Sequence, residues 1–470
     1  MDFVMKINDF INNIVWGVPL IILILGVGIY YTIALGFPQI TKVKYIFKNT
    51  VKKLFHKSEG KGVISSGQAA LVSLGEIIGS GNIAGVATAV ASGGPGAIFW
   101  MWVAAFFGMA TKYIEIGLGI LYRKVNKKDD STKGGPMYYL RDGLRSKFLG
   151  GFYAIMAVLS YIVIVAMVDT NTIVNAVTAK FPSFPPVIVA LIIVAIVGAI
   201  ILGGVKRLGN FSKYFVPVMA LLYIVSGLVV IVYNNNLVID AFLTIIKCAF
   251  TPQAAVGGFA GATITQIIRY GFARGIYSNE AGLGTAAISH SAAKVDSPIK
   301  QAIWAPTEIF IDTIIVNTIT GLVVVMMGLW TTGLDGAELV MNSFDKALPG
   351  GLGSIIIMIA SILFSFTCLT SASYICEECA EYLFGNKSKK IIRVLWLIFI
   401  MIGALTSLEF VWNLADTVNG LMLIPNLIGI IFLGNKVVKL SKEYFKKQKN
   451  SSNSKSFNLI YCRIQRLMIH

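Results

Sequence analysis

Eleven apolar stretches, each long enough to cross a lipid bilayer, constrain this chain more than any other feature of its sequence. A transmembrane helix needs about 20 consecutive, mostly apolar residues. The chain is 56% hydrophobic and only 13% charged, whereas about 25% of the residues of soluble domains are charged. We therefore predict an all-α integral membrane protein with eleven transmembrane helices, near residues 14–37, 65–91, 95–122, 152–179, 185–204, 214–234, 259–293, 300–331, 353–384, 391–412 and 414–434.

The polar parts of the chain are short and leave no room for a separate soluble domain. We divide the chain into an N-terminal helix with a basic loop (1–64), two sets of five helices (65–234 and 235–434) and a basic tail (435–470). The tail contains Asn-Ser repeats, a composition typical of disorder. No cleavable signal peptide is expected, because the first apolar stretch is too long and lacks a small-residue cleavage site.

The basic residues are concentrated in alternate loops. Of the 40 Lys and Arg residues, 32 lie in the tail and in the loops 38–64, 123–147, 206–213, 294–300 and 387–390. With eleven spans these segments all fall on one side of the membrane. The positive-inside rule then places the N-terminus outside and the C-terminus in the cytoplasm of a cell-membrane protein. The net charge of +17 therefore reflects topology in a lipid bilayer and not a nucleic-acid partner.

Two of the predicted spans are interrupted by glycine and polar residues, at Gly79–Gly85 in the second span and Ser278–Gly284 in the seventh. Backbone polar groups freed from a helix are costly in lipid, and such breaks persist where they line a cavity. Close packing of small residues between helices is the alternative explanation for either run alone. Two breaks five spans apart instead indicate two inverted sets of five helices, each opening with its broken helix. This pattern is typical of a secondary transporter with a site at the middle of the membrane.

Several long strings of the sequence are similar to a known family. The strings are GSGNIAGVATAVASGGPGAIFWMW (79–102), GGPMYYL (134–140), FARGIYSNEAGLGTA (272–286), FIDT (310–313) and NLADTVNGLMLIPNL (413–427). They resemble the alanine-or-glycine:cation symporters of the amino acid–polyamine–organocation superfamily, over about residues 15–435. The resemblance implies a leucine-transporter-type core of five-plus-five inverted repeats with one extra N-terminal helix. It also implies sodium-coupled uptake of a small amino acid, with Na⁺ as coupling ion and no other cofactor.

A zwitterionic amino acid needs donors for its carboxylate and acceptors for its ammonium group. Backbone amides at the start of a half-helix suit a carboxylate. By the pattern of the family we assign the carboxylate to Ser80 and Gly81. Including these two, the predicted substrate-binding residues at the breaks are Gly79, Ser80, Gly81 and Asn82 in the second span and Ser278 and Asn279 in the seventh. The alternative is a capped half-helix without a ligand.

Sodium is a hard ion that prefers oxygen ligands. The carbonyls of Gly75, Ile77 and Ile78 end the half-helix that precedes the first break, and the side chain of Asn82 lies beside them in the sequence. Carbonyls at such a helix end suit Na⁺. The sequence therefore predicts a sodium site there, completed from the ninth span by Thr367 and Cys368.

Charged residues inside spans are functional hypotheses by default. The family commonly has Gln at the position of Asp169, whereas Asn171 matches the family pattern. Asp169 is therefore predicted to accept the substrate ammonium, take up a proton or form a structural ion pair; Asn171 is predicted to bind substrate. Glu280 is expected to brace its break, while Glu76 either braces the first break or lies on the cation path.

The ninth span departs from the family string F-T-T-I-L-G-W-S-Y-Y-G-E. Thr367 keeps one of two expected hydroxyls, Cys368 replaces the other, and Ala372 stands where a Trp would close the pocket. Residues 368 and 372 share one helix face, so both are predicted to border the substrate. An Ala at this position predicts that the transported amino acids extend beyond alanine and glycine to serine, threonine or glutamine, unless another side chain fills the space.

Three function classes compete. Sodium-coupled symport of a small neutral amino acid is the main hypothesis. A proton-coupled or uncoupled carrier of the same fold is the alternative, motivated by Asp169 and Cys368. An ion channel or a membrane sensor derived from the fold is the third class. A channel would be expected to show repeated filter loops or rings of charge, and the sequence shows neither. An enzyme is disfavoured, because the three His residues lie in a loop, at a helix end and in the tail. Arg269, Arg274 and Asp312 are expected to brace helices or act as gates.

Overall fold

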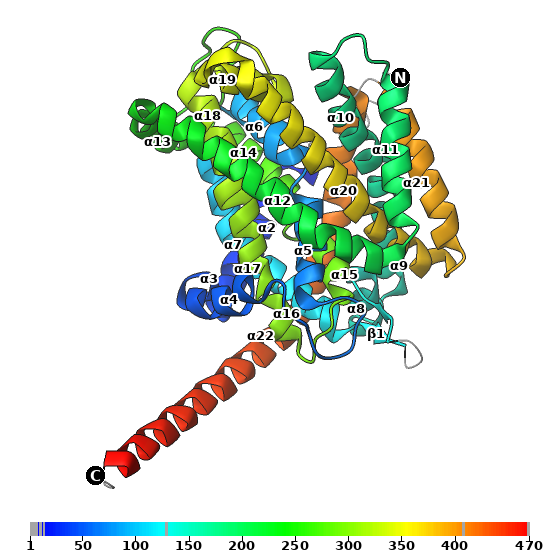
Figure 1. Cartoon of the computed structure of the whole chain (residues 1–470), viewed down its shortest axis with the longest axis vertical. Helices are drawn as coiled ribbons and strands as arrows, with labels where there is room; N and C mark the ends of the chain where they lie inside the picture. The colour runs from blue at the N-terminus through cyan, green and yellow to red at the C-terminus, as the bar shows by residue number, and fades with distance from the viewer. Residues whose placement is uncertain (1–7, 9–11, 13–14, 127–129, 407–408, 468–470) are drawn as a thin grey trace.

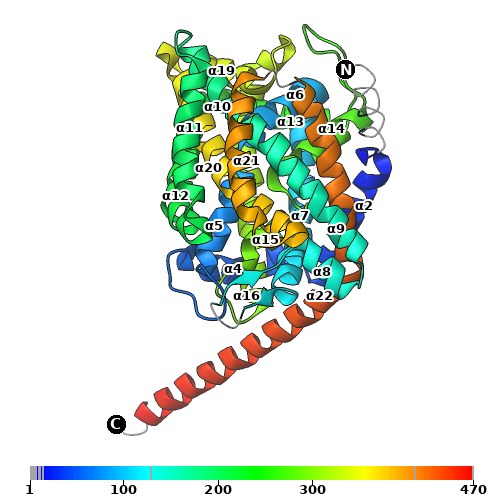
Figure 2. The same ribbon diagram turned by 90° about the vertical axis from the view of Figure 1, so that its right-hand side faces the viewer.

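Helices form nearly all of the structure, a computed structural model that describes residues 8, 12, 15–126, 130–406 and 409–467. The helices stand side by side in one bundle, and helix α22 continues well beyond one end of it (Figures 1 and 2). Strands β1 (Lys124–Val125) and β2 (Thr132–Lys133) form a small antiparallel hairpin at that end. The all-helical membrane-type architecture predicted from the sequence is therefore confirmed.

The helices of the first half of the chain are α2 (Val18–Ala34), α3 (Pro38–Thr41), α4 (Val43–Asn49), η1 (Val51–Lys53), α5 (Ser66–Ile77), η2 (Gly81–Gly85), α6 (Val86–Gly93), α7 (Gly96–Leu121), α8 (Pro136–Gly143), α9 (Lys147–Leu159), η3 (Ser160–Val165), α10 (Ala166–Lys180), α11 (Pro186–Ile201) and α12 (Gly204–Tyr233).

The helices of the second half are α13 (Asn235–Ala249), α14 (Ile264–Asn279), α15 (Thr285–Ser291), α16 (Pro298–Ala302), α17 (Trp304–Ile309), η4 (Phe310–Asn317), α18 (Thr318–Met327), η5 (Leu329–Thr331), α19 (Gly336–Ala347), η6 (Pro349–Gly351), α20 (Leu352–Phe384), α21 (Ser388–Leu405) and α22 (Glu409–Leu467).

Each predicted span coincides with helix, but length and composition support fewer crossings than eleven. Among the described residues, six helical stretches are long and apolar enough to cross a membrane, or seven if the bent pair at the first break is one span. Helices α2 and α11 have only 17 and 16 residues. Helix α14 ends at the second break, and α21 begins with Lys389, Lys390 and Arg393. The four remaining predicted spans are therefore helices that are too short, or carry too many charges, to be recognised as membrane-spanning by length and composition.

Both predicted breaks are present. Helix α5 ends at Ile77 and the chain resumes as helix at Gly81, with a bend of 53° between the two halves. Helix α14 ends at Asn279, and α15 begins only at Thr285. A capping box starts each broken helix, with Ser65 and Gln68 at α5 and Thr263 and Gln266 at α14. Each break therefore follows a well-formed helix.

Three π-helical segments, η2, η3 and η4, lie inside the bundle. π-Helical turns are rare and are frequent at functional sites. They give a helix an extra residue per turn, which turns polar side chains toward a neighbour that a regular helix would not face. The three segments contribute the buried side chains of Asn82, Tyr161 and Asp312, whose hydrogen bonds are described in the next section.

The predicted basic loops gather at one end of the bundle, where α4, α8, β1 and α16 lie in Figure 1. Arg123 ties them together, because its guanidinium donates to the carbonyls of Lys61, Ser291, Ala293 and Val295. At the surface, the adjacent Arg141 holds the pKa of Asp142 below its usual value through a charge-assisted hydrogen bond. This common end is what the distribution of charge along the sequence requires.

The tail differs from the prediction of disorder. Helix α22 continues from the bundle through residue 435 and on to Leu467. Residues 436–449 are rich in Lys, with Glu443 and Gln448, and such unbranched side chains favour helix. The buried Val437 and Val438 also attach the start of this segment to the bundle.

Candidate functional site

A small buried cavity lies between the two broken helices. Its volume is about 30 Å³, room for about two water molecules, so it must widen to admit an amino acid. Six of the residues that line it were predicted to bind substrate or sodium: Ile77, Gly79, Ser80, Gly81, Asp169 and Cys368. The others are Glu76, Ser160, Tyr161, Val165, Tyr277, Glu280 and Asn419.

The first break brings backbone close to this cavity. The Gly79 amide donates to Asn82 Oδ1 at 2.9 Å, a bond within the same segment. A Cβ at Gly79 would lie 3.4 Å from that of Cys368, and one at Gly81 would lie 3.1 Å from the ring of Tyr277. The two glycines therefore keep the backbone within reach of a ligand that a larger residue would displace.

Asp169 faces the first break from α10. Its Oδ1 lies 3.8 Å from the position that a Cβ at Gly79 would take, and Cys368 Sγ lies 3.5 Å from the same position. It is almost fully buried and borders the cavity. A carboxylate at this place can accept a hydrogen bond from a substrate ammonium group.

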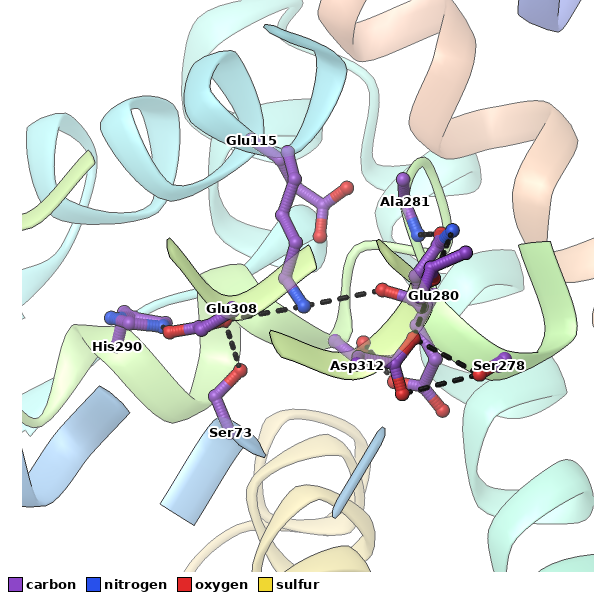
Figure 3. A network of polar contacts seen from close by, with 12 residues as sticks. Ser73, Glu115, Ser278, Glu280, Ala281, His290, Glu308 and Asp312 are labelled. Carbon is purple, nitrogen blue, oxygen red and sulfur yellow. Dashed lines mark hydrogen bonds and ion pairs between the residues drawn. The ribbon is translucent and has the colours of Figure 1, made fainter. Parts of the chain in front are cut away.

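Asn82 and Ser278 join the two broken helices through a polar network. The Asn82 amide donates to Ser278 Oγ (3.1 Å), Asp312 Oδ1 (2.6 Å) and Asn317 Oδ1 (2.8 Å). Ser278 in turn donates to Asp312, and Asn317 donates to Ser278. The four side chains are buried and provide five oxygen atoms. Figure 3 shows Asp312 beside Ser278.

The second break is held by side chains from three other helices. Lys112 of α7 donates to the carbonyl of Asn279 at 3.2 Å, where α14 ends. Glu115, one turn further along α7, accepts from the Gly282 amide at 3.0 Å. Asn426 of α22 donates to the Gly282 carbonyl, and Tyr153 of α9 donates to that of Leu283. The backbone groups freed by this break are thus bonded within the protein.

Lys112 also belongs to a buried ion network. Its ammonium lies 3.2 Å from Glu308 Oε2, and His290 Nε2 lies 2.8 Å from Glu308 Oε1. Ser73 donates to the same carboxylate at 3.0 Å. Figure 3 shows Glu308 between His290 and Ser73. This network joins the four helices α5, α7, α15 and α17.

Glu76 and Glu280 come from the two broken helices and meet at Tyr161. The phenol donates to Glu76 Oε1 at 2.5 Å and approaches Glu280 Oε1 at 3.4 Å. Glu280 has a left-handed backbone conformation (φ 54°) and accepts from Thr285 Oγ1 at 2.6 Å. The Glu280 side chain thus spans the break to the hydroxyl of Thr285, the first residue of α15.

Helix α20 presents two neighbouring faces to α5. A Cβ at Gly75 would lie 3.2 Å from Ser371 Oγ and 3.6 Å from Thr367 Cβ, so these two residues border the half-helix that carries the predicted sodium carbonyls. Cys368 faces Gly79 instead. Ala372 is buried in the apolar core and is not among the residues that line the cavity.

Some predicted residues lie apart from the cavity in this conformation. Asn171 donates to the carbonyls of Gly403 and Thr406 where α21 ends. Asn279 bonds to the Ala281 amide and to Thr313. Arg274 lies 5.9 Å from the ring centroid of Tyr277. Their expected roles in binding or gating stay predictions.

Sequence reasoning missed Lys112, Glu115, Glu308, Asn317 and Tyr161. A signal existed for the three charged residues, because each lies inside an apolar stretch and intramembrane charges mark functional or bracing positions. Asn317 and Tyr161 had no comparable signal, since their neighbours come from other helices.

Interrupted helices that meet at a buried polar cavity inside an apolar bundle define a membrane transporter. The fold is similar to that of MhsT in complex with L-phenylalanine, with a TM-score of 0.59, 14% identity and coverage of 79% of this chain and 89% of the other. It is also similar to a Na⁺-coupled sialic acid symporter, with a TM-score of 0.53, 14% identity and coverage of 84% and 82%. At this identity the likeness concerns the fold alone.

The chain belongs to the sodium:alanine symporter family, whose model matches residues 1–458. It is 44% identical to the sodium/alanine symporter AgcS of Methanococcus maripaludis over 463 residues, which covers 97% of this chain and all of the relative. It is 35% identical to the amino-acid carrier protein AlsT of Bacillus subtilis over 446 residues, covering 94% and 93%. The chain is thus a sodium-coupled amino-acid symporter, as the resemblance in the sequence implied.

Proposed function

We propose that the chain imports a small neutral amino acid, of the alanine or glycine type, together with Na⁺ by alternating access at the cavity between the two breaks. The observation that carries this proposal is the meeting of both breaks at one buried polar cavity. The proposal includes eleven spans in two inverted sets of five, with α2 as the extra N-terminal helix. It places the protein in the cell membrane with the N-terminus outside and the basic end in the cytoplasm.

The amino acid binds with its carboxylate at the Ser80 and Gly81 amides and its ammonium group at Asp169. The geometry supports this, because Ser80, Gly81 and Asp169 border the same cavity and a new helix begins at Gly81. The positive end of a helix dipole favours a carboxylate, and a carboxylate side chain favours an ammonium group. Ser278 and Asn279 complete the site from the second break.

Sodium binds at the end of α5, to the carbonyls of Gly75, Ile77 and Ile78 and to Thr367. Asn82 lies in an oxygen-rich network with Ser278, Asp312 and Asn317, which supports a cation beside the first break as well. Cys368 faces Gly79 and Asp169, so it borders the substrate more closely than it borders these carbonyls.

The test is uptake of labelled alanine into proteoliposomes at fixed pH, with Na⁺ replaced by K⁺ or choline. The proposal expects uptake only with Na⁺, because the oxygen ligands must suit a small hard cation. Equal uptake without Na⁺ under a pH gradient would favour the second candidate, a proton-coupled carrier, which the buried Asp169 motivates. In that case Asp169→Asn should remove the dependence on pH.

The amino-acid range is proposed to extend to serine, threonine or glutamine. One relative, 35% identical over 442 residues, is named a probable sodium/glutamine symporter, GlnT of Bacillus subtilis, which supports a range of side chains within the family. A competition panel against labelled alanine measures this range.

A further inference from the structure

The segment between α2 and α5 exposes apolar side chains along one flank. This segment contains α3, α4 and η1 and lies at the basic end of the bundle (Figure 1). One side of it is fixed, because Ile46 and Thr50 are buried and Thr50 Oγ1 lies 3.0 Å from Thr307 Oγ1 of α17. The segment is therefore part of the folded protein and not a loose loop.

Next to the buried side runs an exposed apolar stripe. Its residues recur every three or four positions along three successive short helices, with one in α3, two in α4, one in η1 and one just after η1. The apolar stripe consists of Ile40, Val43, Phe47, Val51 and Phe55, which are 59%, 50%, 51%, 39% and 57% exposed. Exposed apolar surface of this extent, ordered along one flank, marks an interaction surface.

A lysine row lies beyond the apolar stripe. Lys44, Lys48 and Lys52 are exposed and recur every four residues, each one position after a residue of the stripe. One residue is about 100° of helix rotation, so within α4 Lys44 and Lys48 lie on the side away from the buried Ile46, and Lys52 follows in η1. Residues 38–58 include no Asp or Glu, and the whole flank is therefore positively charged.

The segment thus has three sides: one packed against the rest of the protein, one formed by the apolar stripe and one formed by the lysine row. An amphipathic helix with an apolar flank and adjacent lysines lies in the plane of a membrane interface. Lysine clusters beside a span attract anionic lipid headgroups. The position fits, because α3 begins at Pro38, only a few residues after α2 ends at Ala34.

We propose that this segment binds anionic phospholipid of the adjacent leaflet, with the apolar stripe below the headgroups and the lysine row on their phosphates. The contact reaches the transport machinery. The Leu54 carbonyl lies so close to Gly67 that a Cβ there would be 2.1 Å away, which fixes the first turn of α5. Tyr45 also pairs with Tyr444 of α22 at 2.8 Å between their hydroxyls.

Lipid preference is measured directly on the full-length protein in vesicles, with spin-labelled phosphatidylglycerol compared with spin-labelled phosphatidylcholine. The variant Lys44→Gln/Lys48→Gln/Lys52→Gln should lower the preference for phosphatidylglycerol at least threefold. The matched control Lys446→Gln/Lys447→Gln/Lys449→Gln removes the same charge from exposed positions of α22 and should keep the native preference. An unchanged preference in the first variant, or an equal loss in both, would overturn the proposal.

Depth in the bilayer gives a second readout. A spin label at Phe47→Cys should be accessible to oxygen and protected from a water-soluble nickel complex, whereas a label at Lys48→Cys should show the reverse. A label at residue 47 that is accessible to the nickel complex contradicts insertion. Dipolar broadening between labels would instead identify a second copy of the chain as the occupant, which also overturns the proposal.

The consequence for transport rests on the proposed function. Alanine uptake should increase with the phosphatidylglycerol content of the vesicles in the native protein, and this dependence should be lost in the lysine-row variant. If no lipid supports uptake, the proposed function fails while the two spin-label results still decide on lipid binding. If uptake occurs but is indifferent to phosphatidylglycerol, the link from this segment to α5 is wrong.

Discussion

The two broken helices satisfy their freed backbone groups in different ways. At the second break, Lys112, Glu115, Tyr153 and Asn426 reach in from three other helices. At the first break, the Gly79 amide donates to Asn82 Oδ1 and the Asn82 amide donates to the Gly79 carbonyl, both within the same segment, while Thr320 of α18 donates to the Asn82 carbonyl. Asp169 borders the cavity beside Gly79. The second break is thus held by three other helices, whereas the first is held mostly within its own segment and borders the cavity.

This difference explains how two similar interruptions serve one site. Buried polar backbone without partners costs several kcal/mol, so a break must be completed by protein or by ligand. The second break is completed by protein and is a fixed frame. On the proposed function, the first break is the one that binds ligand: its amides take the carboxylate of the amino acid and the carbonyls before it take Na⁺, so that ligand would complete its structure. The two broken helices would then contribute unequally to binding.

The largest effect is expected from filling the first break. Gly81→Leu should reduce alanine uptake by on the order of 100-fold, because its side chain would meet the ring of Tyr277, 3.1 Å from the Cβ position, and block the close approach of ligand to backbone. Uptake into proteoliposomes, normalised to folded protein, is the measurement. Gly151→Leu lies in α9, outside the break, with no atom within 4 Å of its Cβ position, and should retain uptake; native uptake in Gly81→Leu removes the first break from the mechanism.

Removing a brace of the second break should affect stability. Lys112→Met leaves the buried Glu308 without its lysine, and breaking a buried pair costs about 3–5 kcal/mol. We expect a clear fall in the thermal unfolding midpoint in detergent. The exposed pair of Lys300 and Asp296 supplies the control, since exposed pairs contribute at most about 1 kcal/mol and Lys300→Met should shift the midpoint little. Equal midpoints in both variants would show that Lys112 is not a brace.

A moderate effect is expected at Asp169. Asp169→Asn keeps the shape but removes the charge that is proposed to hold the ammonium group, and hydrogen bonds to charged groups contribute about 1.5–3 kcal/mol. The KM for alanine should rise roughly 10- to 100-fold. Asp240→Asn, at an exposed position of α13, should leave KM unchanged. An unaltered KM in Asp169→Asn would mean that the ammonium group binds elsewhere.

The smallest effect is expected at Ala372. A Trp buries on the order of 200 Å², so Ala372→Trp should narrow the amino-acid range toward alanine and glycine, with competition by larger amino acids about tenfold weaker. Because Ala372 lies in the apolar core and does not line the cavity, the effect requires that the cavity widen toward α20. An unchanged order of competitors would show that it widens elsewhere.

The sequence predicted the breaks because glycine runs inside apolar stretches carry their own signal. It also predicted Gly79, Ser80, Gly81, Asp169 and Cys368 as neighbours, and these residues do border one cavity. It could not predict that Asn82 and Ser278 bond to Asn317, since that network depends on a π-helical turn in η4. Partners from distant helices leave no pattern in a single sequence.

The helix count shows a second limit. Hydropathy identified apolar stretches, but the helix α11 has only 16 residues, fewer than the about 20 that a span needs, and α21 starts with three basic residues. The amphipathic helices α13 and α19 fell between predicted spans, because their polar faces lower the mean hydropathy. Helix α22 continues past residue 435, where composition indicated disorder, because packing of Val437 and Val438 extends it.

Hydrogen exchange of backbone amides tests the central claim most directly, with the full-length protein compared with and without alanine and Na⁺. The first break predicts slow exchange at residues 80 and 81 only when both ligands are present, because the amides of residues 78, 79 and 82 already donate to protein acceptors. The braced second break predicts the same slow exchange at residues 280–284 in both conditions. Ligand-induced protection at 280–284 with none at 80 and 81 would contradict the account, because it would make the second break the one that ligand completes.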